Sequence, residues 1–149
     1  MAKGAIINTV GRDLKNYRKD IIKKVKDLVV DKTTKVELMA NRDLIANSSV
    51  EFNLNFISVD KRFLDGGLTG EVGVMGENEM AAYVEFGTGL SAKKILSKYP
   101  KWIQDIAYQF FVNGMGTLQG KPYLYNNFLV VCGEFVKDLE AILKKEYKS

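Results

Sequence analysis

Apolar residues recur every three or four positions near the start of the chain, where lysine and arginine fill most of the positions between them. They are Val10, Leu14, Tyr17, Ile21, Val25 and Leu28. This spacing places them on one face of an α-helix. We therefore expect a helix from Thr9, its N-cap, to about Val30, roughly 30 Å long at 1.5 Å per residue. The pattern continues more weakly through Val36 and Leu38.

The middle of the chain carries the alternation and the turn residues of β-strands. From Val50 to Phe56, apolar and polar residues alternate, which predicts a half-buried strand. The Asp-Gly-Gly at 65–67 predicts a hairpin turn before a short strand around Glu71 to Val74, and a second turn is expected at 76–78. We interpret AAYVEFG, residues 81–87, as the next strand, closed by glycine.

The remainder of the chain combines a glycine-containing insertion near 90–122 with a second helix. Within the insertion, Trp102, Ile103, Ile106, Tyr108 and Phe110 predict a short helix, and NGMGTLQGKP at 113–122 predicts a loop. From Asn127 the helical period returns and runs into a lysine-rich last turn. Two helices around a run of strands predict one α+β domain over residues 1–149. In it, an antiparallel sheet of about four strands packs against the long N-terminal helix and the C-terminal helix.

The residue types argue against several classes of chemistry. The chain has no histidine, which removes the commonest general base and the commonest metal ligand. The single cysteine, Cys132, cannot form an internal disulfide, and no CxxC or Cys/His cluster is present, so no metal or other cofactor is expected. We interpret Cys132 as a small buried hydrophobe of the last helix. The net charge of +4 predicts a modestly basic surface.

The hydropathy pattern predicts no association with a membrane. The short apolar run at 5–7 is followed by charge from Arg12 onward, unlike the apolar region of a signal peptide. No segment approaches the roughly 20 apolar residues of a membrane span. We therefore expect synthesis in a cytoplasm and no membrane partner.

The stretch MAAYVEFGTGL, residues 80–90, is the strongest candidate for a functional site. A general acid or base at Glu85 would need a partner carboxylate, a metal or an oxyanion donor, and the sequence indicates none. The GTG and the lysines after it match neither GxxxxGK[ST] nor GxGxxG, so a phosphate loop is not predicted. The remaining interpretation is a turn in which Gly87 or Gly89 takes positive φ and the backbone comes close to another chain.

Two alternative functions stay open on the residues alone. The basic segment from Lys15 to Lys26 is typical of a nucleic-acid-binding helix. A small hydrolase using Glu85 is the enzymatic alternative, and the lack of histidine counts against it. Tyr123 and Tyr125 have no basic stripe or RNP-like pattern around them, so we expect them to pack between the loop and the last helix rather than stack on bases.

Two short motifs, in this order, resemble the head-tail joining, or tail-completion, proteins of long-tailed bacteriophages. In that family a strand ending in Tyr-x-Glu-Phe-Gly-Thr precedes a loop, and a proline-aromatic-leucine stretch opens the last helix. The matching residues here are Tyr83, Glu85, Phe86, Gly87, Thr88, Pro122, Tyr123 and Leu124. The insertion YPKWIQDIAYQFFVNGMG is similar to that of longer members from phages of Gram-positive hosts. MANRDLIANSSVEF stands where the family usually has Val-Asp-Thr-Gly before its first strand.

The resemblance implies a structural protein of the phage neck, not an enzyme. Such proteins form a ring, here expected to be a hexamer, at the head-proximal end of the tail tube. The implied partners are further copies of the chain, the tail tube protein and the head-tail connector or stopper protein. DNA would pass through the lumen without sequence-specific binding. The protein would reside in the virion neck, after assembly in the host cytoplasm.

The resemblance also implies a set of subunit or partner interface residues. They are Tyr83, Glu85, Phe86, Gly87, Thr88, Gly89, Gly120, Lys121, Pro122, Tyr123 and Leu124. On this interpretation Glu85 pairs with a lysine or with backbone N–H groups of a neighbour, and residues 87–89 allow close approach. The loop from 113 to 120 would become ordered against the tail tube or stopper protein. A ring requires one such heterologous contact repeated around its axis.

Overall fold

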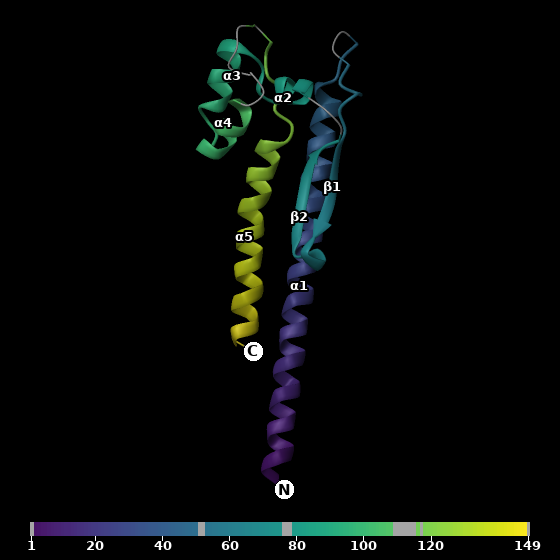
Figure 1. The fold of residues 1–149 in the computed structure, drawn as a ribbon, viewed down its shortest axis with the longest axis vertical. Helices are drawn as coiled ribbons and strands as arrows, with labels where there is room; N and C mark the ends of the chain where they lie inside the picture. Colours follow the sequence, from purple (N-terminus) through teal and green to yellow (C-terminus); the bar gives the residue numbers. More distant parts are fainter. Residues whose placement is uncertain (1, 51–52, 76–78, 109–115, 117, 149) are drawn as a thin grey trace.

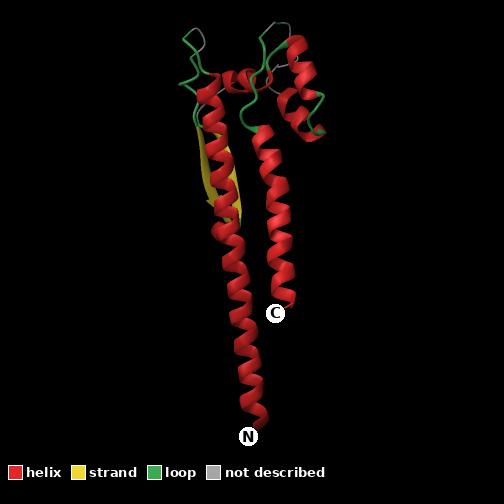
Figure 2. Ribbon diagram, turned by 180° about the vertical axis from the view of Figure 1, so that it is seen from behind, coloured by secondary structure: helices red, strands yellow, loops and turns green. Residues whose placement is uncertain are grey.

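A computed structural model describes residues 2–50, 53–75, 79–108, 116 and 118–148. Its elements are α1 (Ala2–Asn47), β1 (Val59–Leu64), the 3-10 turn η1 (Asp65–Gly67), β2 (Thr69–Val74), α2 (Glu79–Phe86), α3 (Gly89–Leu96), α4 (Lys101–Tyr108) and α5 (Tyr125–Lys148). α1 and α5 run side by side in opposite directions, and the β-hairpin lies along α1 (Figures 1 and 2). The short helices gather at the end of the molecule where α5 begins (Figure 1).

α1 confirms the predicted N-terminal helix but is much longer than expected. It begins at Ala2 and spans 46 residues, roughly 69 Å at 1.5 Å per residue, so Thr9 is not its N-cap. The weaker part of the sequence pattern continues as helix because tertiary packing supports it. In that part the buried positions are Val29, Thr33, Val36, Ala40 and Leu44, whose spacing of three and four faces one side of the helix.

The sheet has two strands, so the expectation of about four strands is wrong. Residues 53–58 form no strand, because Leu54 and Ile57 both point into the core, a spacing of three rather than two. Residues 81–86 are helical in α2, where Ala81, Val84 and Glu85 are buried at helical spacing. Residues 51–52 of the first predicted strand, and the predicted turn at 76–78, lie outside the described residues.

The predicted hairpin is confirmed. β1 and β2 pair antiparallel from Val59 opposite Val74 to Leu64 opposite Thr69, around the turn at Asp65–Gly67. The hairpin packs closely on α1, so that a Cβ added at Gly70 would overlap the Thr33 side chain. Lys61 of β1 adds an ion pair with Glu37 of α1. The side of the hairpin that faces α1 therefore accepts no side chain at position 70.

We expect Gly70→Ala to lower the free energy of unfolding by about 1–3 kcal/mol, because the added methyl group overpacks the contact with Thr33. Gly73→Ala is the matched control on the same strand, since a Cβ there meets nothing within 4 Å. Its effect should stay within about 0.5 kcal/mol. Urea unfolding followed by circular dichroism measures both. Equal losses in the two variants would contradict this packing of the hairpin on α1.

The predicted C-terminal and insertion helices are confirmed, with one addition. α5 begins at Tyr125, and α4 covers 101–108 of the predicted insertion helix; Phe110 and residues 113–115 and 117 of the predicted loop lie outside the described residues. The addition is α3, which begins at Gly89 where only a turn was expected.

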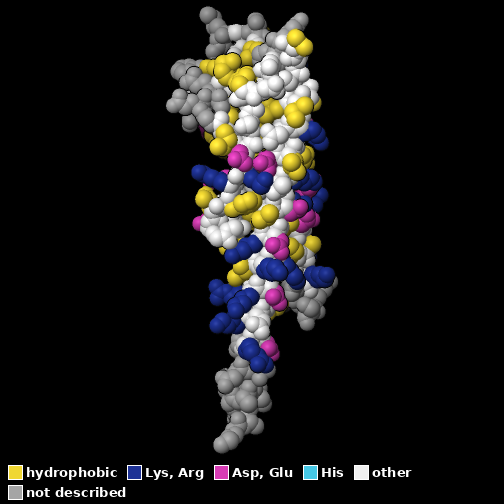
Figure 3. Space-filling view, turned by 90° about the vertical axis from the view of Figure 1, so that its right-hand side faces the viewer, with side chains coloured by type: hydrophobic (Ala, Val, Ile, Leu, Met, Phe, Trp, Pro, Cys, Tyr) yellow, Lys and Arg dark blue, Asp and Glu magenta, His cyan; other side chains and the backbone are white. Residues whose placement is uncertain are grey.

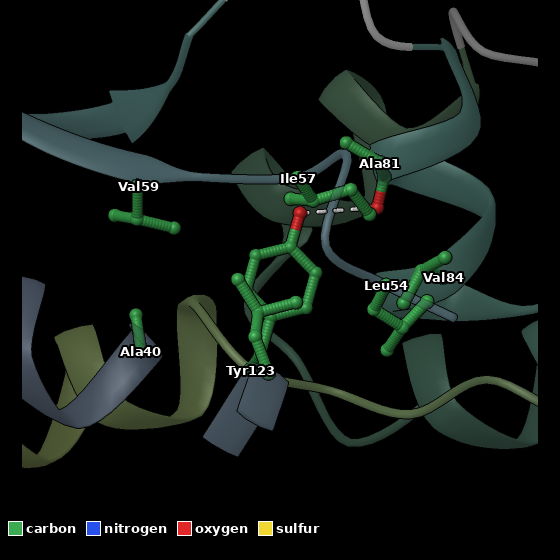
Figure 4. Close-up of a cluster of buried hydrophobic side chains, with 8 residues drawn as sticks. Ala40, Leu54, Ile57, Val59, Ala81, Val84 and Tyr123 are labelled. Carbon is green, nitrogen blue, oxygen red and sulfur yellow. Dashed lines mark hydrogen bonds between the residues drawn. The ribbon is translucent and has the colours of Figure 1, made fainter. Parts of the chain in front are cut away.

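Two apolar clusters hold the elements together. One gathers residues of α1, β1 and α2 around Tyr123, whose hydroxyl donates to the Ala81 carbonyl at 3.2 Å (Figure 4). The other lies between α2, α3 and α4 around Phe86 and Ile103. Tyr123 precedes α5, and Phe86 ends α2, so the junction of α2 with α5 sits where the two clusters meet.

Candidate functional site

The two motifs of the sequence meet in space. Gly87 pairs with Gln119 in an isolated antiparallel bridge. The Thr88 N–H donates to the Leu118 carbonyl at 2.9 Å, and the Lys121 N–H donates to the Val84 carbonyl at 2.6 Å. Backbone hydrogen bonds therefore join the end of α2 to the segment that leads into α5. All of the predicted interface residues from 83–89 and 120–124 fall in this one junction.

Glu85 is the centre of the junction. Its carboxylate accepts backbone N–H groups from Tyr123 at 2.7 Å, Leu124 at 3.0 Å and Tyr125 at 2.9 Å. These N–H groups belong to the first residue of α5 and the two before it, where a helix start leaves donors without internal partners. The positive end of the α5 dipole also favours a negative group there. Glu85 thus fastens the last turn of α2 to the start of α5.

Burial dominates the electrostatics of this carboxylate. The Glu85 side chain is 2% exposed, and this desolvation raises the pKa of its carboxyl above the ordinary value, although the three backbone N–H groups oppose the shift. The nearby Asp43 carboxylate raises it further. Desolvation, followed by the charge of Glu85, also raises the pKa values of Tyr99, Tyr123 and Tyr125, which keeps these phenols protonated.

The sequence predicted that the glycines after Glu85 allow close approach of another chain; in the structure they allow close approach of Gly116, Leu118 and Gly120 of the same chain. Gly87 and Gly89 have φ of +75° and +59°. A Cβ at Gly87 would clash with the Gly120 backbone, and one at Gly89 would clash with the Gly116 carbonyl. The Thr88 hydroxyl accepts the Leu118 N–H at 3.0 Å, which closes the turn.

Aromatic rings and a second polar tie complete the junction. The Tyr125 ring stacks on Phe86 with centroids 5.7 Å apart, and Trp102 contacts Tyr125 edge-on. The Asn127 side-chain amide donates to Asp43 of α1 at 2.7 Å and to the Tyr123 carbonyl at 2.8 Å. This confirms that Tyr123 and Tyr125 pack at the start of the last helix. The sequence showed no signal for Asp43 or Asn127, because their contact joins residues far apart in the chain.

The predicted interface residues fall into a buried group and a half-buried group. Glu85, Phe86, Gly87 and Tyr123 are buried within the chain. Tyr83, Gly120, Lys121, Pro122 and Leu124 are half-buried, as are Thr88 and Gly89. Lys121 Nζ donates to the Asn47 carbonyl at 3.3 Å. Contacts between these residues and a neighbouring chain therefore stay a prediction, whereas their contacts with each other are observed.

The junction is built for holding backbone rather than for acid–base chemistry. Both Glu85 oxygens already accept N–H groups of the same chain, so neither is presented to a substrate proton. Among the described residues, no group of three or more Cys, Asp or Glu side chains could hold a metal ion. Nor does any helix in the described ranges have the length and apolarity to cross a bilayer.

Comparison with models of known protein families, with curated proteins and with solved structures found no match for this chain.

Proposed function

We propose that this chain is a structural protein of a long-tailed phage neck. It forms a ring on the head-proximal end of the tail tube, joins the tail to the head connector and leaves a passage for DNA. The observation that carries the proposal is the Glu85 junction: the two motifs shared with the tail-completion family are bonded to each other through three N–H groups. A physical contact between them explains why they would occur together.

The exposed apolar surface of the long helices supports an assembly role. Leu14 is 63% exposed and Ile45 is 75% exposed on α1, and Val130 is 57% exposed on α5. Such residues remain in water in a single chain, and their burial between subunits would contribute roughly 25 cal/mol per Å² of apolar surface. A ring in which each copy offers one surface to a different surface of the next would cover residues of this kind.

The test is electron cryomicroscopy of the full chain mixed with purified tail tubes. We expect a symmetric ring at one end of each tube, and no ring on tubes alone. The chain alone is the second control, because it separates self-association from assembly on the tube. Tubes whose ends stay bare at a saturating excess of folded protein would overturn the neck assignment.

The basic part of α1 supports a second candidate, a nucleic-acid-binding protein. Between Lys15 and Lys26 there are six lysines and arginines and one aspartate, whereas the whole chain has a net charge of +4. This stretch lies in α1, where residues 15–20 are exposed, and the N-terminal end of α1 extends past the end of α5 (Figure 1); Lys and Arg side chains are grouped on this side of the molecule in Figure 3. A run of positive charge on an exposed helix is typical of proteins that bind a phosphate-rich partner such as nucleic acid.

The same protein preparation distinguishes the second candidate. If it is correct, the affinity for arbitrary duplex DNA should fall steeply as salt is added. The slope of log affinity against log salt concentration should become more negative by about 0.9 for each phosphate contacted. Replacing Lys15, Lys19 and Lys23 by glutamine should flatten that slope. Replacing Lys93 and Lys94, which are exposed on α3, should leave it unchanged. DNA binding at moderate salt with bare tubes would favour this candidate over the neck ring.

A further inference from the structure

The first turns of α1 lie beyond the end of α5. Lys32 of α1 pairs with Asp138 of α5 at 2.7 Å, and α5 continues from there to Lys148. Because the two helices are antiparallel and rise equally per residue, Lys148 lies about opposite residue 22 of α1. Residues 12–20 are all exposed, so no described part of the chain covers them (Figure 1).

This uncovered part of α1 continues the side of the helix that α5 covers elsewhere. Lys32 and Lys35 mark that side, because both pair with acidic residues of α5. Leu14 precedes Lys32, and Tyr17 precedes Lys35, by about five complete helical turns of 3.6 residues, so both face the same side. Leu14 is 63% exposed and Tyr17 is 42% exposed. We call these two residues the N-terminal stripe.

Burial on this side of α1 ends where α5 ends, but the apolar side chains do not. Ile21, Val25 and Leu28 are half-buried near the end of α5, and the N-terminal stripe follows them at helical spacing. The exposed stripe is thus continuous with the packed interface between α1 and α5. A second helix placed in line with α5 would cover the stripe as α5 covers the rest of this side.

The charge around the N-terminal stripe favours an acidic occupant. Lys15, Arg18 and Lys19 are exposed beside it, and residues 15–26 contain six lysines and arginines and one aspartate. The α1–α5 interface shows the matching chemistry, since α5 meets the lysines of α1 with acidic side chains. A second copy of the same stretch would place positive charge against positive charge. Duplex DNA would match the charge, but its phosphate backbone offers no apolar surface to the stripe.

We propose that the N-terminal stripe binds an amphipathic helix of another protein. The apolar side chains of that helix pack on the stripe, and its Glu or Asp side chains lie beside Lys15 and Arg18. It lies in line with α5, so that α1 carries two helices in succession on one side. This contact goes beyond the proposed ring, whose subunit contacts would use other exposed residues, such as Ile45 and Val130.

The test measures the binding of two fluorescently labelled synthetic peptides to the full chain by anisotropy. Both peptides are helical and repeat leucine at alternating steps of three and four, but one carries glutamate and the other lysine at the flanking positions. We expect the glutamate peptide to bind at least about tenfold more tightly than the lysine peptide. Its affinity should also fall as salt is added, because salt screens its contacts with exposed Lys15 and Arg18.

Matched substitutions locate the binding on α1. Leu14→Ser should weaken binding of the glutamate peptide by about tenfold, because an apolar side chain that the peptide buries is lost. Leu38→Ser is the control, since Leu38 is also 63% exposed but lies in the part of α1 that has α5 beside it. This control should change the affinity by less than about twofold. Both replaced side chains are exposed, so both variants should unfold at nearly the same urea concentration.

Two results of the peptide assay would overturn the inference. One is the absence of binding by the glutamate peptide. The other is equal binding of that peptide to the Leu14→Ser and Leu38→Ser variants, since contact with the N-terminal stripe predicts that only Leu14→Ser weakens it. Because the assay uses the free chain without tail tubes, either result leaves the neck assignment to its own test.

Three further measurements identify a different occupant if the glutamate peptide does not bind. Sedimentation velocity that shows self-association, lost in Leu14→Ser, would assign the stripe to a second copy of the chain. Binding of duplex DNA would assign the basic stretch to nucleic acid. Binding of phosphatidylcholine vesicles only when they contain phosphatidylserine would assign it to an anionic lipid surface. Each of these results would overturn the partner helix.

Discussion

Glu85→Ala is expected to lower the free energy of unfolding by about 3–5 kcal/mol. The substitution leaves three backbone N–H groups without their acceptor, at roughly 1–3 kcal/mol for each donor that stays buried, and opens a void beside them. A domain of this size is stable by only about 5–15 kcal/mol. Urea unfolding followed by circular dichroism measures the loss, and ring assembly on tail tubes should fall with it.

The control for this prediction is Glu85→Gln, which keeps the shape of the side chain. One amide oxygen can still accept N–H groups, but the amide nitrogen then faces a donor, so the loss should lie between wild type and Glu85→Ala. A Glu85→Ala protein that is as stable as wild type and yet fails to assemble would contradict the capping role. That result would return Glu85 to the intersubunit role expected from the family resemblance.

The pH dependence of the stability of wild type and Glu85→Gln tests the direction of the pKa shift of Glu85. Burial raises the pKa of Glu85 in the folded chain above its value in the unfolded chain. The folded state therefore binds this proton more tightly, and the resulting stabilisation is present below the unfolded pKa and lost as pH rises through the folded pKa. The stability advantage of wild type over Glu85→Gln should therefore be largest in acid and become smaller as pH rises through the folded pKa. A wild-type advantage that grows with pH would show that the backbone donors outweigh burial.

Gly87→Ala is expected to cost about 2–5 kcal/mol. An L-residue at φ +75° costs roughly 1–2 kcal/mol, and the new Cβ meets the Gly120 backbone, which cannot rotate away as a side chain could. Thermal unfolding measured by calorimetry should show a lower Tm than wild type. The bridge from Gly87 to Gln119 should loosen as well, which amide hydrogen exchange would detect.

Gly133→Ala is the matched control for this prediction. Gly133 lies on the exposed side of α5, and a Cβ there meets nothing within 4 Å. Alanine at this position should stabilise the protein by roughly 0.5–1 kcal/mol, because glycine costs backbone entropy in a helix. If Gly87→Ala proved as harmless as Gly133→Ala, the close approach of the two motifs would be wrong.

The junction suggests how a neck subunit would keep its shape during assembly. Backbone hydrogen bonds join the end of α2 to Leu118 and Lys121, the Glu85 carboxylate joins it to the start of α5, and the Asn127 side chain adds a bond to α1. Together these bonds restrain the orientation of the two long helices, so we expect the amides of Tyr123 and Tyr125 to exchange more slowly with water than those of an exposed turn. On the proposed function, surfaces carried on those helices would then meet neighbouring subunits in a reproducible orientation.

The local periodicity of the sequence was sufficient for α1, α5 and the hairpin, and insufficient for α2. Apolar positions three and four apart predicted the two long helices, and Asp65–Gly67 predicted the turn. In AAYVEFG the apolar residues are nearly continuous, so neither period stands out, and strand was the wrong interpretation. Val50 to Phe56 alternates like a strand, but Leu54 and Ile57 turn into the core instead.

The sequence by itself determined the two amphipathic helices, the hairpin turn and a glycine turn with positive φ at Gly87 or Gly89, because these follow from side-chain period and backbone sterics within a few residues. The structure showed that both glycines have positive φ. Only the tertiary structure decided what Glu85 does. Its three donors lie 38–40 residues away, and a carboxylate looks the same in sequence whether it meets water, a neighbour or a helix start. The open edge of β2 is likewise a property of the fold, because the two-stranded sheet leaves that edge unpaired.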